Sequence, residues 1–221
     1  MNCLTVFSKF FCILAFGLSL LCAGVGYAQV HQQLLLSPLQ KAEALLASKN
    51  YEAAILAYRS LMPAKDNRGY AIRGLVKAYR GAKRVKDVSI FLNQKLAKVS
   101  NPSDFLYGMG YFYYLEGQLK DAEIFFREAV ESDNRNALAH NNLAAILSET
   151  RRNTEALEQV KEALSLNPRE AMFFQNLFLI YKNMGERQQF KKEFEEYRSS
   201  GFKRMAFGYG LVLAREQRQI S

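Results

Sequence analysis

The sequence repeats with a constant period of 34 residues, which holds without insertion from about Leu35 to Arg204. A period of this length is typical of chains in which small units stack in a line and bury their apolar faces on one another. The register predicts five units, at 35–68, 69–102, 103–136, 137–170 and 171–204. We expect residues 29–34 to be a short lead-in and 205–221 to form an amphipathic helix that caps the end of the stack.

The distribution of proline and glycine supports two antiparallel helices in each unit. Glycine and proline are scarce, at 13 and 4 of 221 residues, which favours helices over a fold with many turns. Gly117 and Gly185 stand at the middle of their units, where a left-handed residue would end the first helix. All four prolines fall in a first helical turn or in a connection, and none interrupts a predicted helix: Pro38, Pro63, Pro102 and Pro168.

The spacing of large and small residues resembles the tetratricopeptide repeat family, most fully in the fourth unit. Its diagnostic positions are Leu143, Ala144, Leu147, Ala156, Ala163 and Pro168. The resemblance implies an all-α fold, a right-handed solenoid of antiparallel helix pairs, in a protein of the exported bacterial type that binds other proteins. The second unit departs from the pattern with Val76 and Val88 at small sites. The fifth departs further with Phe178, Phe190 and Tyr197, which predicts a distorted or terminal packing layer.

The segment 1–28 reads as a secretory signal peptide. It contains one cation, Lys9, and no acid, and an apolar run from Phe10 ends in small residues up to Ala28. We expect cleavage after Ala28 and a mature chain that begins at Gln29, in the periplasm. The alternative is an uncleaved anchor, because the apolar segment could nearly span a bilayer. A lipid on Cys22 is disfavoured, because bacterial lipoprotein signals have a small residue immediately before the cysteine, and Leu21 is large.

No residues predict catalysis, a metal site or a cofactor. All three cysteines lie inside the predicted signal peptide, so the predicted mature chain has no thiol chemistry. The two histidines, His31 and His140, are far apart, and His140 holds a repeat position that suits packing between helices. Gly110 is expected to permit close helix packing. We therefore expect that the protein is not an enzyme and uses no cofactor.

Positive charge is concentrated in the second unit, which has a local formal charge of +7 against +9 for the whole chain. A basic surface that carries aromatic residues suggests nucleic acid as a partner. Export argues against nucleic acid and favours acidic segments of proteins as partners. Exposed cations near a turn, such as Lys83, Arg84 and Lys86, are expected to be solvated or to contact anionic membrane or cell-wall polymer peripherally.

The family resemblance implies that the first helix of each unit lines a concave groove. In that register the predicted partner-binding residues are Tyr70, Arg73, Lys77, Arg80, Asp104, Tyr107, Tyr111, Tyr114, Asn141, Asn142, Gln175, Asn176 and Lys182. The groove would be basic, then aromatic, then lined by amides, which suits an extended or acidic peptide. The tyrosines could equally be ordinary helix packing.

Two functional hypotheses follow from these features. The first is an exported scaffold that holds an extended or acidic partner segment and helps to assemble an envelope complex. The alternative is a membrane-tethered assembly factor for secretion or pilus components, with the N-terminal segment retained as an anchor.

Overall fold

The computed structural model describes residues 36–199, which form α-helices and no strands. The predicted all-α fold is therefore confirmed for this part of the chain. The expected signal peptide, lead-in and capping helix, and the side chain of Tyr197, lie outside the described residues. None of the described helices is long and apolar enough to cross a membrane.

The helices follow one another through short connections. In chain order they are α2 (Pro38–Ala47), α3 (Tyr51–Ser60), α4 (Lys65–Gly81), α5 (Val85–Leu96), α6 (Ser103–Leu115), α7 (Leu119–Ser132), α8 (Ala137–Glu149), α9 (Asn153–Leu166), α10 (Ala171–Met184) and α11 (Arg187–Ser199). Helix α4 begins at Lys65, before the predicted start of the second unit at Gly69, so it is the longest of them.

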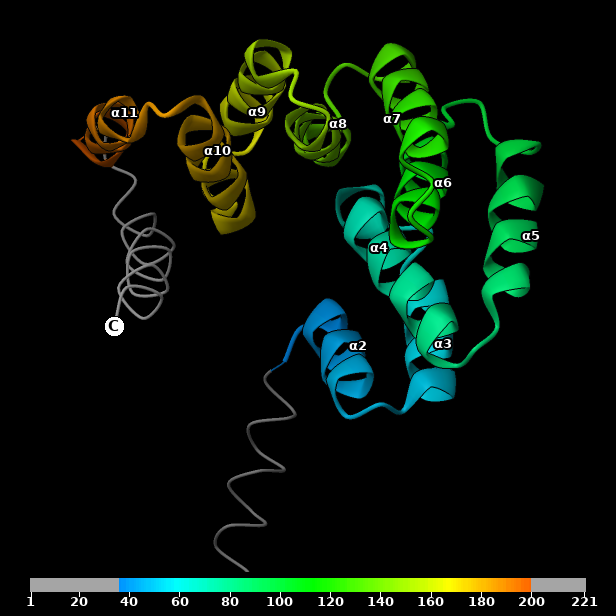
Figure 1. The fold of residues 1–221 in the computed structure, drawn as a ribbon. Helices are drawn as coiled ribbons and strands as arrows, with labels where there is room; N and C mark the ends of the chain where they lie inside the picture. The colour runs from blue at the N-terminus through cyan, green and yellow to red at the C-terminus, as the bar shows by residue number, and fades with distance from the viewer. Residues whose placement is uncertain (1–35, 200–221) are drawn as a thin grey trace, which may run out of the picture.

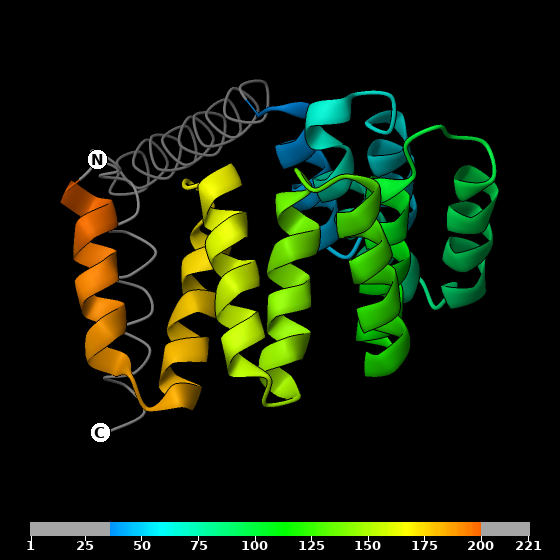
Figure 2. The ribbon, with the colours of Figure 1, turned by 90° about the horizontal axis from the view of Figure 1, so that it is seen from above.

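The helices are arranged as a curved stack of antiparallel pairs (Figures 1 and 2). The even-numbered helices from α2 to α10 contact one another in series and line the inner side of the arc. The odd-numbered helices lie on the outer side. Helix α5 stands apart from its neighbours in both views, and its pair carries Val76 and Val88 where the pattern prefers small residues.

Local sequence signals account for the helix ends. Ser37 and Gln40 form a reciprocal capping box at α2, with Pro38 in the first turn. Gly117 and Gly185 adopt left-handed φ angles of 77° and 80°, as predicted for the turn between paired helices.

The same turn position is left-handed in the other three units, although no glycine stands there. Lys49, Lys83 and Arg151 have φ angles of 61°, 59° and 64°. Together with Gly117 and Gly185 they form a series in which neighbours are separated by one full repeat period, so a single turn geometry recurs through the stack. Only the two glycines could be predicted from the sequence, because lysine and arginine carry no signal for this conformation.

Close packing and aromatic clusters form the core. A Cβ added to Gly110 would lie 2.6 Å from the Phe126 ring, which confirms that close helix approach explains this glycine. In the fifth unit, the rings of Phe178 and Phe190 pack edge to face at 5.1 Å and are buried. The bulky residues of this unit therefore fill an aromatic layer between α10 and α11.

Candidate binding groove

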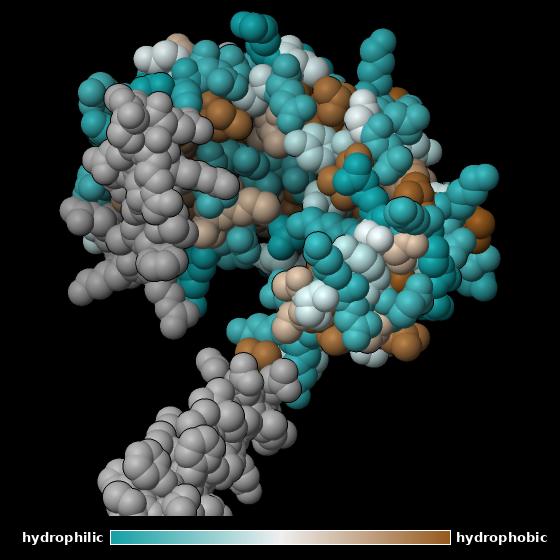
Figure 3. Space-filling view, turned by 60° about the horizontal axis from the view of Figure 1, so that its bottom comes forward, coloured by the Kyte–Doolittle hydropathy of each residue, from teal (hydrophilic) through white to brown (hydrophobic). Residues whose placement is uncertain are grey.

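The inner side of the solenoid surrounds a hollow whose visible wall is largely hydrophilic (Figure 3). Tyr70, Arg73, Lys77 and Arg80 follow one another at intervals of three or four positions, so they share one side of α4. The Arg73 guanidinium lies 5.3 Å from the centre of the Tyr70 ring, and the Lys77 ammonium lies 5.9 Å from that of Tyr111. These contacts place cations near aromatic rings.

Arg80, the third predicted groove cation on α4, is partly neutralised. Arg80 forms an ion pair of 3.4 Å with Glu116, in which both side chains are substantially exposed. Burial of the Lys77 ammonium lowers its pKa, and the neighbouring Arg73 lowers it further.

The tyrosines of α6 are mostly packed inside the stack. Tyr107 is completely buried and Tyr111 is 8% exposed, and their rings stack at 6.2 Å. Tyr114 is half-buried and donates a hydrogen bond of 2.9 Å to Glu149. Burial raises the pKa of Tyr107 and raises that of Tyr114 to about 12. Tyr107 and Tyr111 thus offer a partner little surface in this conformation.

The amides of α8 and α10 form a layer behind the tyrosines. The Asn176 amide donates a hydrogen bond of 2.9 Å to the side-chain oxygen of Asn141, which is fully buried. The Tyr107 hydroxyl and the side-chain nitrogens of Asn141 and Asn142 are buried without a hydrogen-bond partner among the described residues. Gln175 is exposed on α10, whereas Lys182 is half-buried there.

One end of the hollow is closed by contacts between α4 and the start of α10. The Tyr70 hydroxyl donates to Glu170 at 2.9 Å and accepts from Asn167 at 3.3 Å. Arg73 reaches the Met172 sulfur at 3.3 Å. Two predicted groove residues, Tyr70 and Arg73, are therefore already engaged by partners about 100 residues further along the chain.

At the other end, a basic pocket of about 690 Å³ opens where α2, α4 and α6 end. Its lining combines three cations with an apolar floor, and the residues are Leu46, Ala47, Lys49, Tyr51, Lys77, Arg80, Gly81 and Leu115. The pocket brings together Lys77 and Arg80, both predicted from the sequence, with Lys49, which was not. Lys49 reaches it from the left-handed turn between α2 and α3.

A second pocket, of about 630 Å³, lies where α4, α6 and α8 begin. Asp104 lies at its wall and forms an ion pair of 3.5 Å with Arg68. Burial raises the pKa of Asp104, Arg68 opposes this rise, and Asp133 adds to it. Both cations and carboxylates line this pocket, whereas the charged residues that line the basic pocket are all cations.

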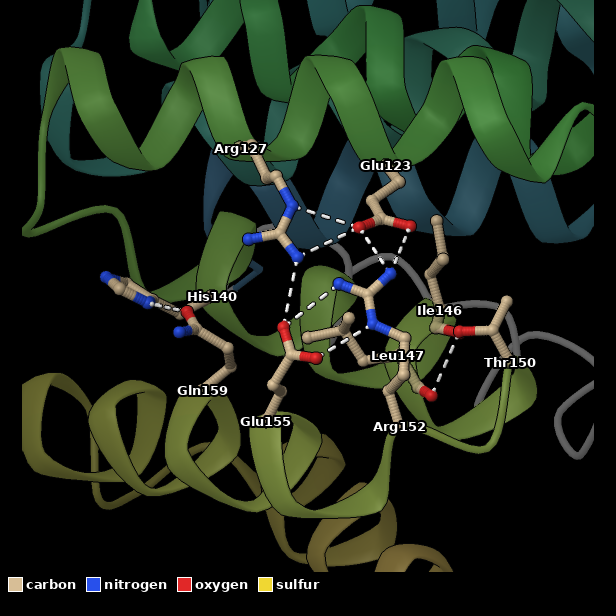
Figure 4. Close-up of polar contacts among 9 residues, drawn as sticks. All are labelled: Glu123, Arg127, His140, Ile146, Leu147, Thr150, Arg152, Glu155 and Gln159. Carbon is tan, nitrogen blue, oxygen red and sulfur yellow. Dashed lines mark hydrogen bonds and ion pairs between the residues drawn. The ribbon is translucent and has the colours of Figure 1, made fainter.

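The polar residues between α7, α8 and α9 have a structural role (Figure 4). Arg127 and Arg152 both contact Glu123, at 2.9 and 2.8 Å, and both also contact Glu155. His140 is buried, with its ring nitrogens 2.7 Å from the Gln159 side-chain oxygen and 3.0 Å from the Asn134 carbonyl. Within residues 36–199 no group of three or more histidine, cysteine, aspartate or glutamate side chains could hold a metal ion.

The curved stack of helix pairs around a hollow defines a helical-repeat scaffold. Comparison with known families agrees: the tetratricopeptide repeat model matches residues 103–136 and 137–170, the third and fourth predicted units. Residues 103–170 therefore match two tetratricopeptide repeats, as the resemblance predicted for these units, and such repeats support a protein-interaction scaffold.

A curated relative and two solved structures are similar to parts of the chain. The type IV pilus assembly protein PilF of Pseudomonas aeruginosa is 37% identical over 84 residues, which cover 37% of this chain and 32% of PilF. The match thus spans about a third of the length of that relative. The crystal structure of MamA is 18% identical with a TM-score of 0.50, over 73% of this chain and 88% of MamA. A monomeric mutant of IFIT1 with Gppp-AAAA is 12% identical with a TM-score of 0.54, over 71% of this chain and 40% of the IFIT1 chain. The two structures show the shared fold alone.

Proposed function

We propose that this scaffold binds an extended, acidic segment of a partner protein at the basic pocket formed by α2, α4 and α6. The single observation that carries the proposal is that Lys49, Lys77 and Arg80 line one pocket together with the apolar side chains of Leu46 and Leu115. Carboxylates of a partner would pair with the cations, and an apolar side chain between them would cover the floor. The segment would continue along α4 toward Tyr70.

Burial of Tyr107, Tyr111 and Asn141 limits which predicted groove residues can take part. We place the first contacts at Lys77 and Arg80, and further contacts at residues that keep some exposure, such as Tyr114 and Gln175. The amide layer would support the tyrosines from behind and would not touch the partner directly.

Binding can be tested with fluorescent peptides of equal length that alternate leucine with glutamate, glutamine or lysine. We expect the glutamate peptide to bind most tightly, and its affinity to fall as salt is added, because exposed charges are screened. The double variant Lys77→Glu/Arg80→Glu should lose this preference. Arg73 stays unchanged in the test, because it also contacts Tyr70 and Met172.

The matched control is Lys86→Glu/Lys98→Glu, which changes the charge of the same unit equally on its outer side. Both lysines are exposed and neither has an ion-pair partner among the described residues. Circular dichroism should show equal helical content in both double variants. Equal loss of peptide affinity in the two would place the binding elsewhere, since only overall charge would then matter.

We further propose that the protein is exported and helps to assemble an envelope complex. The apolar N-terminal segment with small residues at Gly26 and Ala28 supports export, and the similarity to a pilus assembly protein supports a role in the envelope. In the alternative, the same segment is retained and tethers a secretion or pilus assembly factor to the membrane. Mass spectrometry of the mature N-terminus decides between them, because a chain that begins at Gln29 has no anchor.

A further inference from the structure

Three large aliphatic side chains are exposed on the outer helices of the first three units. Leu56 on α3 is 69% exposed, Ile90 on α5 is 54% exposed and Ile124 on α7 is 53% exposed. They are one repeat period apart and so hold one repeat position, where the fourth and fifth units have Glu158 and Lys192. We call these three residues the outer aliphatic row. Exposure repeated in register on successive helices indicates a surface that something covers.

Each member of the row is more than half exposed, so it protrudes from its helix. The basic pocket and the pocket at the helix starts are lined by other residues, and neither includes a member of the row. A rigid protein partner anchors its side chains in packed pockets, whereas the boundary between lipid head groups and acyl chains deforms around protruding side chains. This shape favours a bilayer as the occupant.

The surface around Leu56 and Ile90 is positively charged, so an anionic bilayer attracts it. Around α3 and α5 the acids are Glu52 and Asp87, and Arg84 pairs with both, at 2.9 and 2.7 Å. The other cations of this region have no carboxylate within ion-pair distance among the described residues: Arg59, Lys83, Lys86, Lys95 and Lys98.

Individual cations are placed beside the row. Lys86 lies one helical turn before Ile90, and Arg59 lies three positions after Leu56 and packs over the Phe91 ring at 5.2 Å. Lysine side chains in this arrangement can reach lipid phosphates while their stems cover apolar surface. On α7, by contrast, acids outnumber cations, so Ile124 would lie at the edge of the contact.

We propose that the outer faces of α3 and α5 dock the solenoid on an anionic phospholipid bilayer. Leu56 and Ile90 would enter the boundary between head groups and acyl chains, and the unpaired cations would contact lipid phosphates. This orientation leaves the basic pocket free for a partner, because the pocket is lined mainly by the C-terminal ends of α2, α4 and α6 and includes only Tyr51 from α3. The proposal does not depend on the proposed peptide binding.

The absence of tryptophan from the sequence provides a local test in the full chain. The single substitutions Ile90→Trp and Leu56→Trp each introduce a unique fluorescent reporter. With vesicles that contain about 30 mol% phosphatidylglycerol, we expect a blue shift and quenching by brominated acyl chains, and neither with pure phosphatidylcholine. The control is Leu179→Trp on α10, a leucine that is also exposed but lies outside the row. Its emission should not change, and the N-terminal segment is the same in all three variants.

Charge reversal gives the second measurement. Lys86→Glu/Lys98→Glu in the Ile90→Trp chain should weaken vesicle binding about tenfold or more, because each lysine near an anionic surface contributes about fivefold. Lys77→Glu/Arg80→Glu should change it at most a few-fold. Leu56→Ser/Ile90→Ser should reduce co-sedimentation with the same vesicles.

Three results would overturn the proposal. One is unchanged emission of Trp at positions 56 and 90 with anionic vesicles. Another is an equal shift for Leu179→Trp. The third is a blue shift that appears without vesicles as the protein is concentrated, since a second copy of the chain would then cover the row.

Discussion

The Tyr70 hydroxyl donates a hydrogen bond of 2.9 Å to the Glu170 carboxylate, although 100 residues separate them in the sequence. In a linear repeat stack each unit contacts only its neighbours, so this bond exists because the stack curves back on itself. Burial raises the pKa of Tyr70, and the Glu170 carboxylate raises it further, so the phenol keeps its proton and acts as the donor.

Removal of this donor should loosen the closed end of the solenoid. We expect Tyr70→Phe to lower the free energy of unfolding by about 1–2 kcal/mol, since a partly buried carboxylate loses a hydrogen bond. Urea denaturation followed by circular dichroism measures it. Tyr113→Phe is the matched control, because that ring stacks on Phe125 and its hydroxyl has no hydrogen bond within the described part of the chain. Equal effects of the two substitutions would show that the contact with Glu170 contributes nothing.

The left-handed turn residues predict a stabilising substitution. Lys83→Gly should raise the free energy of unfolding by about 0.5–1 kcal/mol, because glycine adopts its φ of 59° without steric cost. Gln94→Gly, in the last turn of α5, should instead lower it by up to about 1 kcal/mol, because it places a glycine within a helix. Chemical denaturation of both variants tests the sign. Destabilisation by Lys83→Gly would mean that its side chain has a role that outweighs the strain.

The contact between Gly110 and Phe126 predicts a coupled pair of mutations. Gly110→Ala should cost about 1–3 kcal/mol, because its Cβ would lie 2.6 Å from a ring atom of Phe126. Phe126→Leu alone should also destabilise, but the double variant should lose less than the two single losses together. Thermal and urea unfolding of the four chains completes the cycle, and strict additivity would contradict close packing as the reason for this glycine.

The ion pairs around Glu123 predict a stability effect that depends on salt. Glu123→Gln leaves Arg127 and Arg152 without their shared carboxylate, and should lower the free energy of unfolding by about 1 kcal/mol at low salt. The difference from the unchanged protein should shrink near 1 M salt, where the Debye length is about 3 Å. A loss that is the same at both salt concentrations would indicate packing and not charge.

Asp104 predicts a dependence of stability on pH. Because burial raises its pKa in the folded chain, the folded state binds the proton more tightly than the unfolded state does. The contribution of Asp104 to stability is therefore full below the unfolded pKa and is lost as pH rises through the folded pKa. Asp104→Asn should be neutral or stabilising at pH 7, and its advantage should disappear in acid. Unfolding measured between pH 3 and pH 7 tests this, and a clear loss of stability at pH 7 would show that the ion pair with Arg68 outweighs burial.

Much of the architecture could be predicted because the signals are local and repeated. The repeat pattern, the positions of Pro38 and Pro102, and the turn glycines Gly117 and Gly185 each act within one unit. Their agreement predicted paired helices, and the structure confirms these helices in the described residues. The capping helix, the signal peptide and the exact division into units stay predictions.

The candidate site was less predictable, because exposure depends on how units pack. The repeat register placed Tyr107 and Asn141 on the groove, but neighbouring helices bury both completely. Lys49 was not predicted for the basic pocket, since it reaches the pocket through a left-handed turn that lysine does not signal. Leu56, Ile90 and Ile124 hold the same position in the repeat. Apolar residues that recur at one position are usually assigned to the core, so the sequence did not predict their exposure.

The sequence alone determined the repeat, the pairing of helices and the basic character of the second unit, because these depend on neighbouring residues and on composition. Only the tertiary structure decided that Tyr70 meets Glu170, and that Lys49 joins Lys77 and Arg80 around one pocket. The physical reason is that small rotations between successive units add up along the stack. The total rotation along the stack decides whether residues in distant units meet, and no local sequence pattern specifies that total.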